Sequence, residues 1–579
     1  MHRASLRLCA LTAGLLMASW PAVAATFTWD GGSLVDNNWS TPENWVGNVA
    51  PPNDGTADIV MTGTTRPTPN VDTAWSINKL SFTGGTFTLG GSQLTVGAGG
   101  LASTGGTGPQ TINNAIAVNG NQTWTANSAT RALVVNGNLT GTSTILVNTS
   151  NIYNALRLGG SNTGFTGTLD LMNSNNQDML LLKPSAMTGG TVLVGKSGAN
   201  SNFHLMGAGS PGTYTMGVGS GAGELQFRLA GWGGVAPADG DVDWDPGNGG
   251  DYTLASGGFD FGAPVGGSPG INLGNSTSSL VFTGGNKAFW GITNSGVAAT
   301  MVTVRSALSD DGSPRALTVA GANVALTQPH TGSNGNGNTT IQSYGTLAIS
   351  NLDQIFGGNL NLSTNGTLML DGIDWATFTA ARSYGTGAGQ WQLNGGGFAA
   401  RSAELLIATN PTGFTWDNRN FTLGTTALLN GVVYGDAGVE IAVPISLGSS
   451  ATTPRTLLLL GRNIESTTNW TLRGPVHELS GQLSGTVQSL TLQGRGYHLP
   501  ESLGGTLRIS NPANDFVGSV IVQGGGAVGI FTSDGAFGDA ANPVKSTDVG
   551  GGTAGGMILL EDANSSGPTT FSRALSIEV

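Results

Sequence analysis

Four aspartates at alternate positions are the residues of this chain whose types and spacing come closest to a chemical site. Asp239, Asp241, Asp243 and Asp245 lie in the stretch ADGDVDWDPGNGGD. If this stretch is extended, the carboxylates from 241 to 245 share one face, because alternate residues of a strand point the same way. Such a face could bind Ca²⁺, which takes several oxygen ligands. A solvated acidic loop, a calcium site and a carboxylate-based polysaccharide-cleaving site are the three interpretations of these residues.

The calcium-binding loops of known type do not match this stretch. In register with an EF-hand loop, Pro246 stands where a glycine is needed and Tyr252 where a bidentate acid is needed. The stretch does not recur either, as a tandem calcium-binding nonapeptide would. A solvated loop is therefore the favoured interpretation, and no metal site is assigned.

Two glycine-rich stretches match enzyme motifs but are interpreted as turns. Gly266–Gly270 (GGSPG) fits G-x-S-x-G, and Gly207–Gly212 (GAGSPG) fits G-x-G-x-x-G. A nucleophile elbow needs a strand, a sharp turn and a helix, and a dinucleotide loop needs a helix whose N-terminus holds the phosphates. Strand-like INLG and TYTMGVG follow instead.

The remaining ionisable residues form no constellation. Zinc sites need ligands at short spacing, and no such pair occurs among the histidines of this chain. We expect the histidines to be solvated or packed between coils. They are His2, His204, His330, His477 and His498. Three arginines lie among polar residues and form no basic patch: Arg462, Arg473 and Arg495. We therefore predict no catalytic, cofactor-binding or metal-binding residues and no enzymatic activity.

The element that must position any site is a repeated pair of short strands. LRLGGSNTGFTGTLDL at 156–171 returns as LRISNPANDFVGSVIV at 507–522, each with apolar residues at alternate positions and a polar bend containing asparagine, an aromatic and a glycine between the strands. A middle copy begins at Leu317 and resumes at Asn338, so the copies lie near 155–195, 316–370 and 505–545. Repeated strand–turn units that cannot bury their own apolar face predict a stacked β-solenoid with about 20–30 residues per coil.

A sequence repeat longer than one strand pair is also expected, and so is one helix. GGF occurs at Gly257 and again at Gly396, each after a copy of the strand pair. Positions 373–382 are the best helix candidate, although they could equally form a strand.

Composition agrees with an all-β, exported chain. Of 579 residues, 95 are glycine and only 10% are charged, and the mean hydropathy is +0.03. This composition is too apolar for a disordered polar chain, so the glycines are expected to serve tight turns. The net charge of −12 excludes nucleic acid as a partner, because binding it requires clustered basic residues.

Residues 1–25 have the features of a secretory signal peptide. Arg3 and Arg7 precede an apolar segment, and Ala22-Val23-Ala24 forms a small-residue cleavage site; a membrane anchor is the rival interpretation. The apolar segment is too short to span a bilayer. Cys9, the single cysteine, lies in this segment, so the mature chain has no disulfide scaffold.

The rest of the chain is divided into two segments. Residues 26–80 form a tryptophan-rich N-terminal cap segment, in which Trp29, Trp39 and Trp45 either close the end of the stack or provide platforms for sugars. Residues 81–579 form the β-strand repeat solenoid, and no cap is evident at its C-terminal end.

Several stretches together resemble the autotransporter-associated β-strand repeat proteins. They are WDGG…NNWSTPENW…APPNDGTADIV near the N-terminus, TINNAIAVNGNQTW, SNTGFTGTLDL, NPANDFVGSVIV and GGGFAARSA. The resemblance implies a right-handed parallel β-helix, displayed on the cell surface or outer membrane or secreted as a passenger domain. Members of that family often continue into a C-terminal barrel translocator or a sorting anchor, and neither occurs in this sequence.

The expected function is non-enzymatic: a structural or adhesive role in adhesion, aggregation, biofilm or the cell envelope. Extracellular polysaccharide or other cell surfaces are the expected partners, with self-association as a further expectation; a membrane is expected only through a missing C-terminal translocator or anchor. No cofactor is expected. The alternatives are an extracellular polysaccharide-active β-helix enzyme, either a lyase or a glycosidase, and a non-functional fragment of a longer autotransporter.

Overall fold

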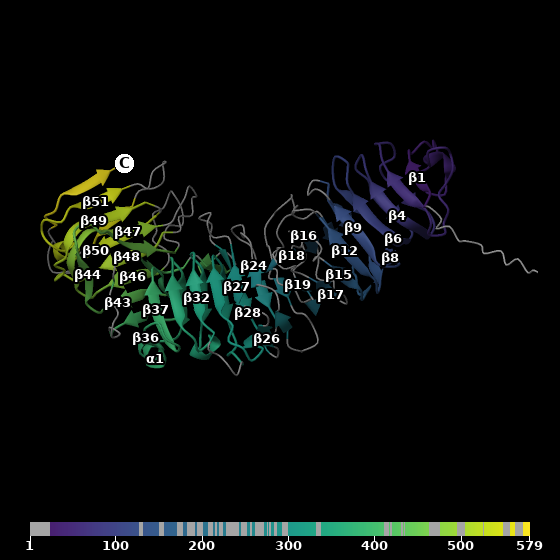
Figure 1. The fold of residues 1–579 in the computed structure, drawn as a ribbon. Helices are drawn as coiled ribbons and strands as arrows, with labels where there is room; N and C mark the ends of the chain where they lie inside the picture. Colours follow the sequence, from purple (N-terminus) through teal and green to yellow (C-terminus); the bar gives the residue numbers. More distant parts are fainter. Residues whose placement is uncertain are drawn as a thin grey trace, which may run out of the picture.

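The computed structural model describes an all-β chain. It covers residues 24–126, 131–149 and 156–170, and most of 271–578 with gaps; between 171 and 270 it describes only the backbone of short strands. The strands follow one another in a long row, from β1 at one end to β51 at the other (Figure 1). Among the described residues there is one α-helix, α1 (Trp375–Ala381), in place of the helix candidate at 373–382. No described helix is long and apolar enough to cross a membrane.

The first of the long sheets, here called the N-terminal sheet, has twelve strands. They are β1 (Thr26–Trp29), β2 (Asp58–Met61), β4 (Trp75–Phe82), β6 (Leu94–Ser103), β8 (Ile116–Val118), β9 (Gln122–Ala126), β11 (Leu139–Gly141), β12 (Thr144–Asn148), β14 (Gly164–Phe165), β15 (Thr168–Asp170), β17 (Thr191–Leu193) and β20 (Gly217–Val218). The expected boundary after residue 80 lies inside β4, so the sheet runs through it without interruption.

A second long sheet, the middle sheet, has fifteen strands. They are β3 (Asn70–Val71), β5 (Thr88–Gly91), β7 (Gln110–Ile112), β10 (Leu133–Val135), β13 (Leu156–Leu158), β16 (Asp178–Leu181), β18 (Ser201–Leu205), β21 (Glu224–Gln226), β24 (Gly258–Asp260), β27 (Lys287–Trp290), β30 (Leu317–Ala320), β32 (Thr339–Gln342), β34 (Leu360–Ser363), β36 (Ser383–Tyr384) and β37 (Gln390–Asn394).

The third long sheet, the C-terminal sheet, has seventeen strands. They are β19 (Gly212–Tyr214), β22 (Val242–Trp244), β25 (Ile271–Leu273), β28 (Ala299–Val304), β31 (Asn323–Leu326), β33 (Thr346–Ile349), β35 (Thr367–Asp371), β38 (Gly397–Arg401), β40 (Phe421–Leu423), β41 (Ala427–Leu429), β42 (Val432–Val433), β44 (Ile445–Ser450), β45 (Arg455–Leu459), β47 (Leu483–Gly494), β49 (Val517–Gln523), β51 (Val544–Thr547) and β53 (Leu575–Glu578).

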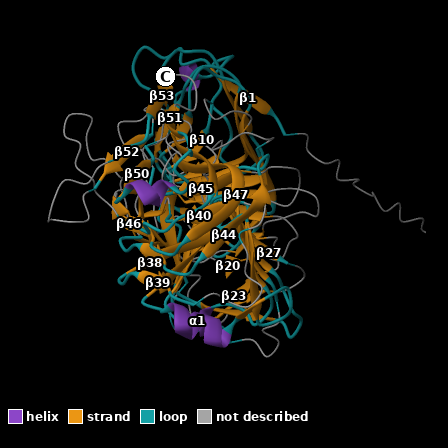
Figure 2. Cartoon of the chain, turned by 90° about the vertical axis from the view of Figure 1, so that its left-hand side faces the viewer, coloured by secondary structure: helices purple, strands orange, loops and turns teal. Residues whose placement is uncertain are grey.

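Two smaller sheets complete the described strands. One contains β23 (Tyr252–Leu254), β26 (Ser279–Phe282) and β29 (Ala307–Asp310). The other, the six-stranded sheet, contains β39 (Leu405–Ile407), β43 (Val439–Ile441), β46 (Val476–Leu479), β48 (Thr506–Ile509), β50 (Val528–Phe531) and β52 (Met557–Leu560). In the view of Figure 2, α1 lies at the edge of the strand layers.

Parallel pairing joins these strands, with a regular sequence offset in part of the middle sheet. In the middle sheet Leu133 pairs with Gln110 on one side and with Leu156 on the other, and Leu156 pairs with Met179. The offset is 23 residues, the separation that also joins Leu139 to Asn162 by a hydrogen bond. Apart from the hairpin β41–β42, the strand pairings of the described residues are parallel. This arrangement is consistent with a β-solenoid.

The core lies between the sheets and is built from stacked columns of apolar side chains. The registers align one such column across six strands of the N-terminal sheet: Phe27, Ile59, Leu80, Leu101, Trp124 and Val147. Residues on either side of a column member point the other way, since side chains alternate along a strand. Both predicted strand pairs follow this rule: Leu156, Leu158 and Leu169 are buried in the first, and Leu507, Ile509, Val520 and Val522 in the second.

The longer sequence repeat predicted from the two GGF sequences is wrong. The strand after Gly257 is β24, in the middle sheet, whereas the strand after Gly396 is β38, in the C-terminal sheet. The two GGF sequences therefore occupy different places in the stack. The physical reason is that Gly-Gly-Phe records only a tight bend followed by a strand, which any sheet can use.

Candidate functional site

Most of the residues singled out by sequence motifs lie outside the described residues. Both glycine-rich motifs lie outside, apart from the backbone of Gly212. Only the backbone is described for Asp243 in β22 and for His204 in β18. The other singled-out residues outside the described part are Asp239, Asp241, Asp245, His498, Arg462, Arg473 and Arg495. The signal-peptide residues 1–23 also lie outside. In the described parts, no group of three or more His, Cys, Asp or Glu side chains is placed to hold a metal ion.

The three N-terminal tryptophans belong to the core. Trp29, Trp39 and Trp45 are each 0% exposed. Trp45 packs edge-on against Trp29 and Trp39, with ring centroids 5.2 and 5.5 Å apart, and its Nε1 donates to the carbonyl oxygen of Trp39 at 2.7 Å. The alternative that these rings form sugar platforms is therefore wrong, because a stacking platform needs an exposed ring face.

The asparagine of the repeat links its bend to an earlier strand of the stack in both copies. Asn162 Oδ1 accepts a hydrogen bond from the backbone N–H of Leu139 at 2.6 Å, and Asn514 Oδ1 accepts one from Leu483 at 2.7 Å. Both asparagines are buried. A buried backbone N–H needs a partner wherever a bend interrupts the ladder, and the amide oxygen supplies it. The repeat motif is therefore structural.

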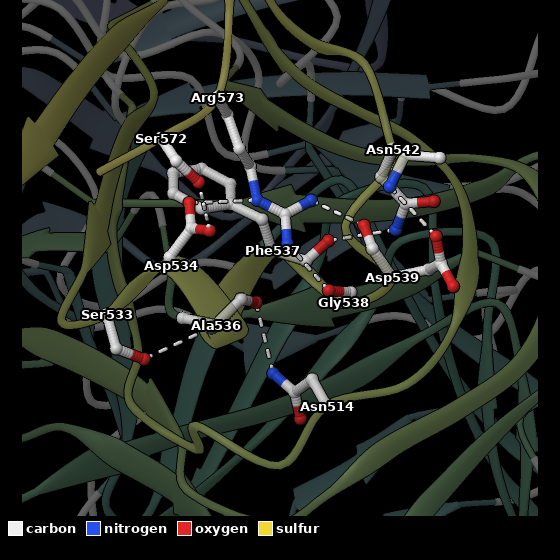
Figure 3. A network of polar contacts seen from close by, with 11 residues as sticks. Asn514, Ser533, Asp534, Ala536, Phe537, Gly538, Asp539, Asn542, Ser572 and Arg573 are labelled. Atoms are coloured by element: carbon white, nitrogen blue, oxygen red, sulfur yellow. Dashed lines mark hydrogen bonds and ion pairs between the residues drawn. The ribbon is translucent and has the colours of Figure 1, made fainter. Parts of the chain in front are cut away.

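Replacing Asn514 with alanine should destabilise the C-terminal coils by about 3 kcal/mol, because it leaves a buried N–H and a buried carbonyl oxygen unpaired. The second group is the carbonyl oxygen of Ala536, to which Asn514 Nδ2 donates at 3.1 Å (Figure 3). Urea unfolding measures the loss. The exchange of the exposed neighbour Asp515 for alanine is the control and should change stability by less than about 0.5 kcal/mol; equal effects would contradict the assignment.

An arginine closes a turn close to this asparagine. Arg573 Nη2 donates to the carbonyl oxygen of Gly538 at 2.8 Å and its Nε to Asp534 at 3.1 Å, while the guanidinium lies 5.6 Å from the Phe537 ring centroid (Figure 3). A second arginine does the same elsewhere: Arg382 donates to the carbonyl oxygens of Phe356 and Gly358. Both arginines satisfy carbonyl groups at Phe-Gly turns, so they are structural.

His477 is a core residue of β46. It is 0% exposed, and its Nδ1 accepts a hydrogen bond from the backbone N–H of Val439 at 3.1 Å. Burial lowers the pKa of His477 from 6.5 to about 4, and the nearby carbonyl group of Leu460 opposes this shift only in part. Nε2 forms no well-made hydrogen bond. The imidazole is therefore neutral at physiological pH and serves the packing between coils.

Acid should destabilise the fold through this histidine. The unfolded chain binds a proton near pH 6.5 and the folded chain only near 4, so stability is constant above pH 6.5 and falls as the pH drops toward 4. The full loss is about 3 kcal/mol. We expect His477→Asn, whose Oδ1 can accept the same N–H, to lose most of the pH dependence between 6.5 and 5, and His330→Asn to keep it. Urea midpoints across this range measure both, and identical profiles would contradict the assignment.

A row of charged side chains crosses the outer face of the six-stranded sheet. Glu440 pairs with Glu478, and Glu478 with Arg508, in neighbouring strands. Arg508 lies 3.6 Å from Glu478 and 2.8 Å from Glu561, and both partners raise the pKa of its guanidinium, Glu561 through a hydrogen bond most strongly. Ser480 and Ser510 donate to Glu440 and Glu478 respectively. These carboxylates are used to hold successive coils together.

The outer face of the N-terminal sheet carries a different, nearly uncharged column. The registers align these residues from six strands: Thr28, Val60, Ser81, Ala102, Thr125 and Asn148. Their neighbours two positions earlier include Asp58 and Lys79, and Asn78 Nδ2 donates to Asp58 Oδ1 at 2.7 Å. The side chains are small, and neighbouring strands lie about 4.8 Å apart. We call this outer column and its neighbours the ladder face.

The ladder face presents many groups that can each make a weak contact with a partner. Its hydroxyl and amide groups donate and accept hydrogen bonds, and the charged residues among its neighbours are the register partners Asp58 and Lys79. The sequence alone does not show this column, because only the register of the strands brings these residues together.

The chain was also compared with known proteins. No protein-family model, no curated protein and no solved structure matches it. The functional interpretation therefore depends on the residues themselves.

Proposed function

We propose that this chain is an exported right-handed parallel β-helix with a structural or adhesive role at the cell surface or outside the cell. The observation that supports the proposal most is the ladder face: a column of small polar and apolar side chains held in register over six parallel strands. A regular, rigid surface of this kind suits repeated weak contacts with a partner that is itself extended, such as a polysaccharide or another cell surface.

Avidity supplies the physical argument. A single hydroxyl contact contributes little, since hydrogen bonds to the partner replace hydrogen bonds to water. Contacts along a rigid column act together, because once the first forms the others become intramolecular. Rigidity also lowers the entropic cost of binding. Low charge on this face leaves dispersion and hydrogen bonding as the main attractive forces.

Two arginines on the ladder face should strongly reduce adhesion without unfolding the chain. In Ala102→Arg/Thr125→Arg, two adjacent members of the column become long and charged, so a partner can no longer lie flat on it. The matched control is Thr377→Arg/Ala380→Arg, which places the same two residues on exposed positions of α1. Cells displaying the full chain are measured for retention on coated surfaces, clumping and biofilm, with thermal unfolding to verify the fold.

The ladder-face variant should reduce retention about tenfold or more, as expected when several linked contacts are lost together. The α1 variant should behave like the wild type. If a strain that lacks the protein adheres, clumps and forms biofilm normally, the adhesive role is excluded. If both double variants retain full adhesion, the partner does not bind the ladder face.

A further inference from the structure

We propose that Arg455 and the hydroxyl-rich turn before it form a binding site for an oxyanion. The chemical class is a sulfate, phosphate or carboxylate group, either as a free ion or as a substituent of a larger molecule. The site lies where β44 ends and β45 begins in the C-terminal sheet, far in sequence from the ladder face, and the inference does not depend on the proposed function.

Arg455 is a buried cation with almost no partner. Its side chain is 2% exposed, and its single hydrogen bond is from Nη1 to the carbonyl oxygen of Pro454 at 3.2 Å. Nε is enclosed and has no hydrogen-bond partner. By contrast, the buried Arg382 and the half-buried Arg573 donate to two and three acceptors respectively. A buried charge without compensation is costly, so a missing acceptor is expected at Arg455.

The free edge of the guanidinium has the geometry that recognises oxyanions. Because Nη1 is used by Pro454, the N–H groups that remain are those of Nε and Nη2, which lie side by side on one edge of the planar fork. That edge donates two parallel hydrogen bonds to carboxylate, sulfate or phosphate oxygens. Nη2 has no described partner and is not one of the fully enclosed atoms, so the edge can be reached there.

A glycine lets the guanidinium take this position. Gly448 has φ of +102°, and a Cβ atom on it would lie 2.6 Å from Arg455 Nη2. Any larger residue at 448 would therefore displace the guanidinium or cover its free edge.

Three hydroxyl side chains lie close together in the turn just before Arg455. Residues 446–453 read SLGSSATT, and Ser450 Oγ lies 3.2 Å from the Thr452 hydroxyl and 3.0 Å from the Thr453 hydroxyl. Three hydroxyl groups clustered within one turn can rotate to donate to a bound anion, as serine and threonine hydroxyls do in anion sites. Ser450 and Thr453 are half-buried, which limits competition from water.

No carboxylate from the adjoining strands competes for the arginine. The strands that pair with β45 are β40 and β47, and β44 precedes it; none of the three contains an ionisable residue. Along the chain, the nearest acids are Glu440 and Glu465. In a chain with more acids than bases, a buried arginine kept apart from every described carboxylate indicates that its counter-ion comes from outside the chain.

The test is the effect of sulfate on thermal unfolding of the full chain, with chloride replacing sulfate at constant ionic strength. Sulfate stabilises proteins generally by exclusion from their surface, so the informative quantity is the difference between variants. The variants are Arg455→Met, which removes the charge, and Arg455→Lys, which keeps the charge but loses the fork. The control Arg401→Met removes a surface arginine whose partner is Asp371.

A saturable rise in Tm is expected for the wild type and for Arg401→Met, a smaller rise for Arg455→Lys, and no saturable part for Arg455→Met. Equal responses of all four chains would overturn the proposal. Equilibrium dialysis of the wild type against labelled sulfate needs no variant: one saturable site per chain is expected, and its absence would overturn the proposal even if Arg455→Met fails to fold. Phosphate and a sulfated dextran should displace the sulfate, and displacement by neutral dextran would also contradict an oxyanion site.

Discussion

Leu169→Asp should be the most damaging single exchange at the repeat, costing at least about 4 kcal/mol, because it removes a buried leucine and buries a carboxyl group. Leu169 is 0% exposed and pairs with Ile145 on one side and Val192 on the other. An aspartate there must either lose its charge or draw water between two coils. Urea unfolding gives the loss of stability, and hydrogen exchange gives its extent along the row of strands.

The matched control for this exchange is the preceding residue. Thr168→Asp places the same carboxyl group one position earlier in β15, where the side chain faces outward and is half-buried. We expect it to change stability by no more than about 0.5 kcal/mol, as surface exchanges usually do. Hydrogen exchange should accelerate in β12 and β15 for the leucine variant and remain unchanged for the threonine variant. A larger loss from Thr168→Asp would mean that the strand faces the other way.

Trp45→Ala should destabilise the N-terminal end of the chain by about 3–5 kcal/mol, the usual cost of deleting a fully buried tryptophan side chain. The exchange removes two edge-on ring contacts and leaves the carbonyl oxygen of Trp39 without the Nε1 donor. The effect should be largest in β1 and β2, which pair with each other directly. Thermal unfolding followed by tryptophan fluorescence measures it.

A neighbouring residue again provides the control. Val46 follows Trp45 directly and is 60% exposed, so Val46→Ala should be within about 0.5 kcal/mol of the wild type. Trp45→Phe should lie between the two, since it keeps an aromatic ring but loses the hydrogen bond to Trp39. If Trp45→Ala unfolds like Val46→Ala, the tryptophans do not hold this end of the core together.

The all-β class could be predicted because its signals are local. Alternation of apolar and polar residues at 156–171 and 507–522 predicted which side chains are buried, and the register of the strands agrees with it. The asparagines of the bends were found for the same reason: an interrupted ladder needs a side-chain acceptor, and few residues besides asparagine tolerate the bend.

The assignment of strands to sheets could not be predicted. The same kind of strand pair contributes to the N-terminal and middle sheets at 156–170 but to the six-stranded and C-terminal sheets at 506–523. Sequence alternation specifies the face of a strand but not its neighbours, which depend on contacts between coils. The two GGF sequences suggested a repeat that does not exist for this reason. The helix α1 was ambiguous in the sequence because a seven-residue helix is shorter than two complete turns.

The candidate sites depended on tertiary placement even more strongly. The inward position of His477 follows from the alternation in β46, yet a lone histidine gives no sequence signal of burial. Arg455 begins a strand whose other inward residues are leucines, which is a signal that could have been found: a charged residue in phase with a buried apolar column. Its lack of a partner becomes visible only when all neighbouring strands are in place.

Cysteine cross-linking between two register partners tests the stacked arrangement most directly. In a Cys9→Ser chain, which is otherwise free of cysteine, Thr125→Cys and Asn148→Cys introduce register partners on β9 and β12. Neighbouring strands lie about 4.8 Å apart, within the Cα separation that a disulfide spans. The control pairs Thr125→Cys with Val147→Cys, whose side chain points inward. Mass spectrometry without reduction should find the 125–148 cross-link and not the 125–147 one; the reverse result, or no cross-link in either chain, would contradict the stacking.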